Sequence, residues 1–201
     1  MALKVILTDL DGVIRHFPSQ RDGAIEASLG LPFGVIAGVA FSEALLQQAI
    51  TGRITDEAWR AAIRANLAQN FGDSLAQRAV DQWSESSGEV HHEVLEPLLG
   101  LKGKFPLMLL TNATSRLKRD LTRLGIWHQL DRVFNSSEIG IAKPDPRIFE
   151  HVLGSLGCKS AEVLFIDDSS ANVAAGRTAG FQVLHFQRGV TCLEDELSKF
   201  N

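Results

Sequence analysis

Short apolar runs alternate with amphipathic segments over much of the chain. Runs of strand length lie at residues 3–8, 105–110, 163–166 and 181–186, with a weaker one at 132–135. Helical patterns at 115–124, 146–156 and 170–179 are each followed by a glycine, the residue that commonly ends a helix. Strands that alternate with helices predict a parallel sheet covered by helices. The expected fold class is therefore α/β, with a Rossmann-like parallel sheet core.

The stretch from residue 15 to residue 97 interrupts this alternation. It contains no convincing strand, and its helical candidates are residues 23–29, 42–50, 55–68 and 74–83. At Thr55 a hydroxyl N-cap and two acids in the first turn precede an apolar stripe, as is typical of a helix start. We therefore expect a helical cap over residues 15–97, inserted into a catalytic core formed by residues 1–14 and 98–201.

Composition and charge narrow the range of functions. The formal net charge is -4, and the 20 Lys and Arg residues form no run, so nucleic-acid binding has little support. Cys158 and Cys192 are too few for a disulfide framework, and we interpret both as reduced thiols. No uninterrupted apolar run is long enough to span a bilayer. We expect a cytoplasmic protein that acts on a small soluble substrate, with no membrane and no nucleic acid as partner.

Polar residues follow the apolar runs or lie near them at four places. In an open parallel sheet the ligand site lies beyond the carboxyl ends of the strands, so these residues are the candidates for chemistry. The four places are Asp9-Leu10-Asp11-Gly12, Leu109-Leu110-Thr111-Asn112, Lys143-Pro144 and Asp167-Asp168.

Each place, taken alone, also fits an ordinary structural role. The first fits a strand followed by an Asx turn, and Thr111 with Asn112 fits a serine/threonine turn. Lys143 fits a solvated lysine, and either of the adjacent acids fits a helix cap. Two adjacent carboxylates with no cation beside them in sequence are harder to explain without a metal.

Taken in order, the four places make the chain similar to the haloacid dehalogenase superfamily over essentially its whole length. This resemblance implies a Rossmann-like core with a helical cap inserted after the first motif. The strings at residues 52–57 and 142–149 also resemble the subgroup that includes sugar-phosphate phosphatases and the phosphatase domains of some epoxide hydrolases.

The resemblance implies a magnesium-dependent phosphatase that acts on a small phosphorylated metabolite, possibly a sugar phosphate. Asp9 would be the nucleophile and form an aspartyl-phosphate. The side chain of Asp11 would be free to protonate the leaving oxygen and then to activate water. Lys143 would offset the charge of the nucleophile and the phosphate. Family members that cleave carbon-halogen bonds typically lack the second acid, so Asp11 favours phosphoryl transfer.

The same resemblance assigns ligands for the phosphate and for Mg²⁺. The phosphoryl oxygens would contact Leu10, Gly12, Thr111 and Asn112. The metal would be held by Asp9, by the backbone carbonyl of Asp11 and by one of the two adjacent acids. We favour Asp168 as that ligand with Asp167 behind it, and the sequence leaves their order open.

Two other functions remain open at this point. One is a phosphomutase of the same family, and the other is a non-catalytic binding protein on this fold. The sequence also leaves the substrate and the oligomeric state open. Weak candidates for substrate recognition on the cap are Arg15, His16, Arg53, Trp59, His91 and His92.

Overall fold

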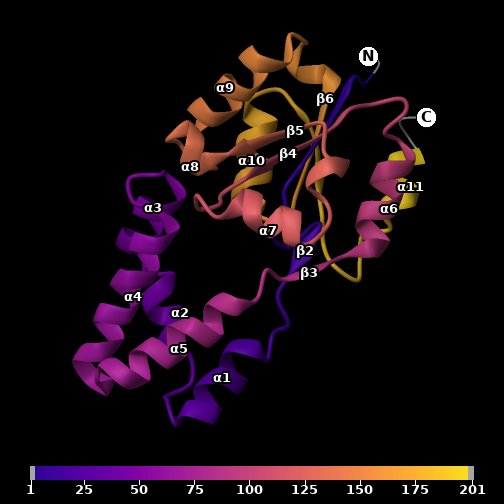
Figure 1. The fold of residues 1–201 in the computed structure, drawn as a ribbon. Helices are drawn as coiled ribbons and strands as arrows, with labels where there is room; N and C mark the ends of the chain where they lie inside the picture. Colours follow the sequence, from indigo (N-terminus) through magenta and orange to yellow (C-terminus); the bar gives the residue numbers. More distant parts are fainter. Residues whose placement is uncertain (1–2, 199–201) are drawn as a thin grey trace.

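The computed structural model describes residues 3–198, except for the side chain of Glu194. Five parallel strands form a sheet in the order β5-β4-β1-β6-β7 (Figure 1). The strands are β1 (Val5–Thr8), β4 (Leu107–Thr111), β5 (Arg132–Asn135), β6 (Val163–Asp167) and β7 (Gln182–His185). Each was expected within two residues of these bounds, and the predicted α/β fold class with a helical insertion is confirmed.

Helices cover both faces of the sheet. Alternate residues of a strand point to opposite faces, and in β6 Leu164 and Ile166 belong to one buried cluster, whereas Val163 and Phe165 belong to another. Residues of α6 (His92–Gly100), α7 (Leu117–Arg123) and α11 (Leu193–Ser198) join the first cluster. Residues of α9 (Pro146–Leu156) and α10 (Ser170–Thr178) pack in or against the second. The remaining elements of this part are α8 (Ser136–Ile139) and the 3-10 helices η1 (Trp127–Gln129) and η2 (Ser160–Glu162).

Five helices form a separate layer with its own hydrophobic cluster, which we call the cap (Figure 1). They are α1 (Arg21–Leu29), α2 (Val35–Ala40), α3 (Glu43–Ile50), α4 (Asp56–Phe71) and α5 (Asp73–Glu85). As expected, Thr55 caps α4 by accepting a hydrogen bond from the N–H of Ala58, and Trp59 lies on the buried stripe. A two-residue antiparallel ladder, β2 (Arg15–His16) with β3 (Glu89–Val90), joins the segments that enter and leave the cap.

The structure adds elements that the sequence pattern did not predict. Helix α2 has no local cap of its own: the carboxylate of Glu26 in α1 accepts from the N–H groups of Gly34 and Ile36. Helix α6 continues through Pro97, and its apolar residues lie in the cluster that contains β1. We therefore propose that the cap ends before α6, earlier than residue 97. The expectation of no strand between residues 15 and 97 was wrong, because the two short strands β2 and β3 lie there.

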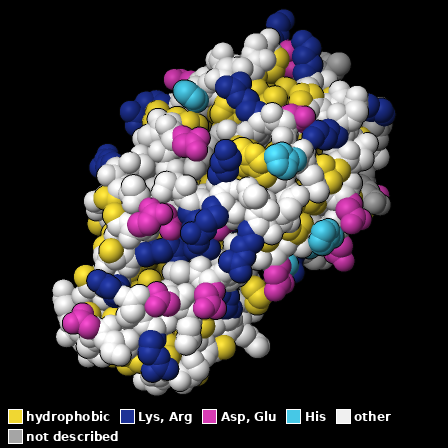
Figure 2. All heavy atoms as spheres, viewed as in Figure 1, with side chains coloured by type: hydrophobic (Ala, Val, Ile, Leu, Met, Phe, Trp, Pro, Cys, Tyr) yellow, Lys and Arg dark blue, Asp and Glu magenta, His cyan; other side chains and the backbone are white. Residues whose placement is uncertain are grey.

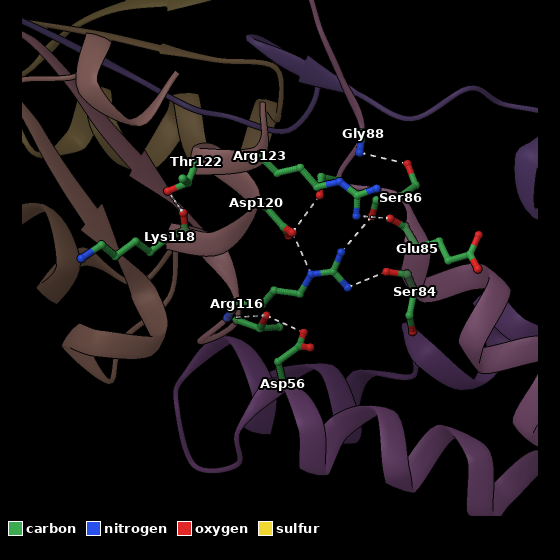
Figure 3. Close-up of polar contacts among 12 residues, drawn as sticks. Asp56, Ser84, Glu85, Ser86, Gly88, Arg116, Lys118, Asp120, Thr122 and Arg123 are labelled. Atoms are coloured by element: carbon green, nitrogen blue, oxygen red, sulfur yellow. Dashed lines mark hydrogen bonds and ion pairs between the residues drawn. The ribbon is translucent and has the colours of Figure 1, made fainter. Parts of the chain in front are cut away.

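Arg116, at the N-cap of α7, and Arg123, in its last turn, bind the end of the last cap helix (Figure 3). The last carbonyls of a helix lack partners within the helix and attract cations. Arg116 donates to the carbonyls of Ser84 and Ser86 at 2.8 and 3.0 Å, and Arg123 donates to that of Glu85 at 2.8 Å. These bonds fix the C-terminal end of α5 on the core.

The visible surface carries both acidic and basic side chains. On the face in Figure 2, basic and acidic side chains are interspersed, including where the cap meets the core. Among residues 3–198, no helix is both long enough and apolar enough to cross a membrane.

Candidate active site

The sheet brings three of the four predicted places together. Strands β4, β1 and β6 are neighbours, so their carboxyl ends lie at one edge. Asp9 and Asn112 directly follow β1 and β4, and Asp167 ends β6 with Asp168 after it. One ligand oxygen from each of the three acids Asp9, Asp167 and Asp168 lies within 4.8 Å of the others.

The remaining predicted place, Lys143, also lies here, and its ammonium is between two of these acids. The Nζ atom is 2.8 Å from Oδ1 of Asp9, 2.7 Å from Oδ2 of Asp167 and 2.8 Å from the carbonyl of Leu110. Its side chain is 1% exposed, and three acceptors match its three N–H donors. Burial alone would lower the pKa of Lys143, but the charges of Asp9 and Asp167 raise it above its ordinary value. Lys143 is therefore a buried cation rather than a solvated lysine.

Asn112 holds the backbone of Lys143 in place. Its Nδ2 donates to the carbonyl of Lys143 and its Oδ1 accepts from the Lys143 N–H, both at 2.8 Å. The amide carries one further N–H that is suited to a phosphoryl oxygen. Sequence reasoning expected only the phosphate contact and missed this second role.

Asp9 is a buried carboxylate in a crowded acidic environment. Burial raises the pKa of Asp9 to about 7, although Lys143 lowers it, and the negative charge of Asp167 raises it further. A divalent cation beside Asp9 would favour its charged form, because an opposite charge offsets both burial and repulsion between the acids.

The two adjacent acids differ in their surroundings. Asp167 is fully buried and accepts from Lys143, from Nδ2 of Asn172 at 3.0 and 3.1 Å, and from the N–H of Ser169 at 2.8 Å. Asp168 is exposed, and partial desolvation together with the charge of Asp167 raises the pKa of Asp168. The donors that surround Asp167 leave Asp168 as the acid with room for a cation. The atoms available to bind a metal here are carboxylate oxygens. Mg²⁺ prefers such ligands, so these residues fit a magnesium ion.

Gly12 allows the close approach of the first and fourth places. A Cβ atom at Gly12 would lie 1.9 Å from Oδ2 of Asp168, and the φ angle of Gly12 is +87°. Its N–H, expected to contact phosphate, donates instead to the carbonyl of Arg15 at 2.8 Å. Of the other two predicted phosphate contacts, Thr111 is buried at the end of β4, and Leu10 has a fully buried side chain, so only its backbone can reach a ligand.

The side chain of Asp11 is paired, whereas the sequence analysis expected it to be free. Nε and Nη2 of Arg15 donate to Oδ1 and Oδ2 of Asp11 at 2.6 and 2.8 Å. The Asp11 side chain is still 45% exposed and lies in the wall of a cavity, so it remains accessible to a substrate. Arg15 itself is buried, and it also contacts Ser87 beyond α5 and Asp120 of α7.

This cavity, of about 270 Å³, is lined by residues of both the cap and the core. Core residues Asn112 and Thr114 form part of its wall, and Phe41 and Trp83 come from the cap. Asp56 of α4 joins the two parts, because its carboxylate accepts from the hydroxyl of Thr114 at 2.8 Å.

Two of the six weak candidates for substrate recognition line this cavity. They are Arg15 and Trp59, and Arg15 is already paired with Asp11. Within the described chain, the four that lie outside the lining are His16, Arg53, His91 and His92. Sequence reasoning missed Arg116 and Asp120, although their spacing of four residues on a helix was a signal for an ion pair.

Comparison with known proteins shows the family to which the chain belongs. The model of the haloacid dehalogenase-like hydrolases matches residues 3–180. The chain belongs to this family. The resemblance drawn from the sequence is thus confirmed, and phosphatases among the relatives support a phosphohydrolase within the family.

Three relatives illustrate the range of the family. Bifunctional epoxide hydrolase 2 of Mus musculus is 29% identical over 97% of this chain, which spans only 38% of that protein. D-ribitol-5-phosphate phosphatase of Bacteroides thetaiotaomicron is 26% identical over 93% of each chain. The crystal structure of a haloacid dehalogenase family enzyme from the same bacterium, in complex with magnesium and inorganic phosphate, has a TM-score of 0.76. It is 24% identical and covers 94% of this chain and 97% of its own, which shows the shared fold.

Proposed function

We propose that the protein is a magnesium-dependent phosphatase that hydrolyses a small phosphate monoester through a phosphorylated Asp9. The observation that carries the proposal is the arrangement around Asp9. Its carboxylate lies against Lys143 and within 4.8 Å of two further acids, and Asp11, two residues on, lines a cavity. The relatives named as phosphatases and the family structure that holds magnesium and phosphate support the same conclusion.

Positive charge is the first requirement of this chemistry, because a phosphate dianion repels a carboxylate nucleophile. Lys143 supplies part of that charge, at 2.8 Å from Asp9. A magnesium ion, when bound, would supply the rest at the phosphoryl oxygens; Asp9, Asp168 and the backbone carbonyl of Asp11 would hold it. Asp167 keeps the ammonium of Lys143 in position, and Asn172 in turn donates to Asp167.

The reaction then proceeds in two transfers. The carboxylate of Asp9 attacks phosphorus, the bond to the leaving oxygen breaks, and Asp11 gives that oxygen a proton. Asp11 next takes a proton from a water molecule, which attacks phosphorus and releases inorganic phosphate and the carboxylate of Asp9. The fork of Arg15 fixes the plane of the Asp11 carboxylate, and one of its hydrogen bonds must give way when Asp11 turns to the leaving oxygen.

The test is release of phosphate from p-nitrophenyl phosphate with and without magnesium. We expect turnover that is lost on exhaustive chelation and restored by Mg²⁺. The variant Asp9→Asn should be inactive, whereas Asp73→Asn, at an exposed acid on α5, should match the wild type. Full activity after chelation or in Asp9→Asn would refute the proposal.

A further inference from the structure

The cavity between cap and core carries no unpaired charge in its described lining. Four arginines and four aspartates contribute to it, with no lysine, glutamate or histidine. Every arginine has an aspartate partner. The pairs are Arg15 with Asp11 at 2.6 Å, Arg21 with Asp22 at 3.4 Å, Arg60 with Asp56 at 2.5 Å and Arg116 with Asp120 at 2.7 Å.

Each of these arginines also donates to a backbone carbonyl or to a hydroxyl. Arg116 binds two carbonyls at the end of α5, and Arg15 binds the carbonyl of Ser87. Arg21 binds the carbonyl of Trp83, and Arg60 binds the hydroxyl of Ser84. Arg15 and Arg116 therefore hold the end of α5 on the core, whereas Arg21 and Arg60 join helices within the cap. An anionic group of a ligand would have to compete with these aspartates for the guanidinium groups.

The wall that faces these pairs is aromatic. The ring of Phe41 lies 6.4 Å from that of Trp59 and 6.1 Å from that of Trp83, and the two tryptophan rings are 5.4 Å apart. Aromatic rings at these distances and tilts pack favourably with one another and with an apolar guest. Phe41 is 52% exposed and Phe17, also in the lining, is 41% exposed, so both rings have apolar surface that a ligand would cover.

The size of the cavity limits the occupant. A cavity of about 270 Å³ has room for a small organic group. Asp11 lines the same cavity. A group in the cavity can therefore present its oxygen to the acid that protonates it.

We propose that the leaving group of the substrate is an uncharged, largely apolar alcohol or phenol. Its body packs against the exposed rings of Phe41 and Phe17, with Trp59 and Trp83 packed behind Phe41, and its oxygen meets Asp11. The inference rests on the proposed phosphatase function and adds the class of substrate. The balanced reaction takes one phosphate ester and one water to the free alcohol and inorganic phosphate.

Three alkyl phosphates of similar leaving-group basicity test this assignment, because differences among them then report on binding. They are 3-phenylpropyl phosphate, glycerol 1-phosphate and 3-carboxypropyl phosphate, each assayed for phosphate release with magnesium. We expect kcat/KM for the phenylpropyl ester to exceed the other two by at least about tenfold, as a well-filled apolar pocket allows. Equal values, or a preference for glycerol phosphate, would overturn the inference.

A preference for the carboxylate ester would also overturn it, and would point to Arg21, which has the longest of the four ion pairs. Phosphate release from p-nitrophenyl phosphate distinguishes a wrong substrate class from a wrong phosphatase function. Turnover of that ester with the wrong order among the alkyl esters refutes the substrate class alone. Turnover of no ester refutes the phosphatase function and this inference together.

Two phenylalanine variants supply a matched comparison within the cap. Phe41→Ala should lower kcat/KM for the phenylpropyl ester by about tenfold while leaving glycerol phosphate little changed. Phe33→Ala removes a ring that is 90% exposed and outside the cavity lining, so it should leave the ratio of the two esters as in the wild type. Equal ratios in both variants would contradict the aromatic wall as the binding surface.

Discussion

Replacement of Gly12 by alanine tests whether Asp168 holds the metal. The new methyl group would lie 1.9 Å from Oδ2 of Asp168 and 2.5 Å from its Cγ. Ordinary contact begins at 3.4 Å, so the carboxylate must retreat by about 1.5 Å, the difference between 3.4 and 1.9 Å. Rotation of the Asp168 side chain achieves this more easily than movement of the backbone. The cost of the substitution should therefore fall mainly on metal binding.

Two magnitudes follow for Gly12→Ala. Mg²⁺ requires ligand oxygens at about 2.0–2.1 Å in near-octahedral geometry, so a carboxylate displaced by more than an ångström no longer binds it. We expect magnesium affinity to fall by at least about tenfold, and up to about 100-fold, by analogy with the loss of groups that support metal ligands. Separately, an alanine at a positive φ angle costs about 1–2 kcal/mol of folding free energy.

A control glycine separates these effects. Gly125 has a φ angle of +75°, and a Cβ there would meet nothing within 4 Å, so Gly125→Ala carries the backbone cost without the clash. Urea unfolding in chelator should show similar losses of stability for both variants. Calorimetric titration with Mg²⁺ should show weaker binding for Gly12→Ala alone. Wild-type affinity in Gly12→Ala would mean that Asp168 is not a ligand.

Two further substitutions extend the test to the acids and to the cap. Asp168→Asn should weaken magnesium binding more than Asp167→Asn, because donors already surround Asp167; the reverse order in a metal titration would exchange their roles. Arg116→Ala should lower the free energy of unfolding by about 3 kcal/mol, because it removes the nearest cation from Asp120 and the donor from two carbonyls at the end of α5. The neighbouring exposed Arg119→Ala should change it by less than about 0.5 kcal/mol, and equal effects of the two in urea unfolding would contradict the anchoring role.

The strands of the sheet could be predicted from the sequence because their apolar runs are distinct. Strand β6 places Val163 and Phe165 on one face and Leu164 and Ile166 on the other, and a run that is apolar on both faces predicts a strand covered on both sides. The meeting of Asp9 with the acid pair followed from the parallel sheet, since the carboxyl ends of neighbouring strands share one edge.

Other features depend on contacts between distant residues, which periodicity does not report. Helix α2 is short and rich in β-branched residues, and its N-terminus is capped by Glu26 from another helix. Lys143 looked like a solvated lysine, and only the family resemblance placed it in the site. The pairing of Arg15 with Asp11 requires the turn between them, which brings both groups of the fork onto one carboxylate.

The most direct test of the account is to locate the phosphoryl group during turnover. In the variant Asp11→Asn the first transfer to Asp9 should survive with p-nitrophenyl phosphate, whose leaving group needs little protonation, while attack by water becomes slow. Rapid quenching of this variant with ester and magnesium, followed by peptide mass spectrometry, should find one phosphoryl group on Asp9. A phosphoryl group on another residue, or release of nitrophenolate with no phosphorylated protein at any time, would contradict Asp9 as the nucleophile.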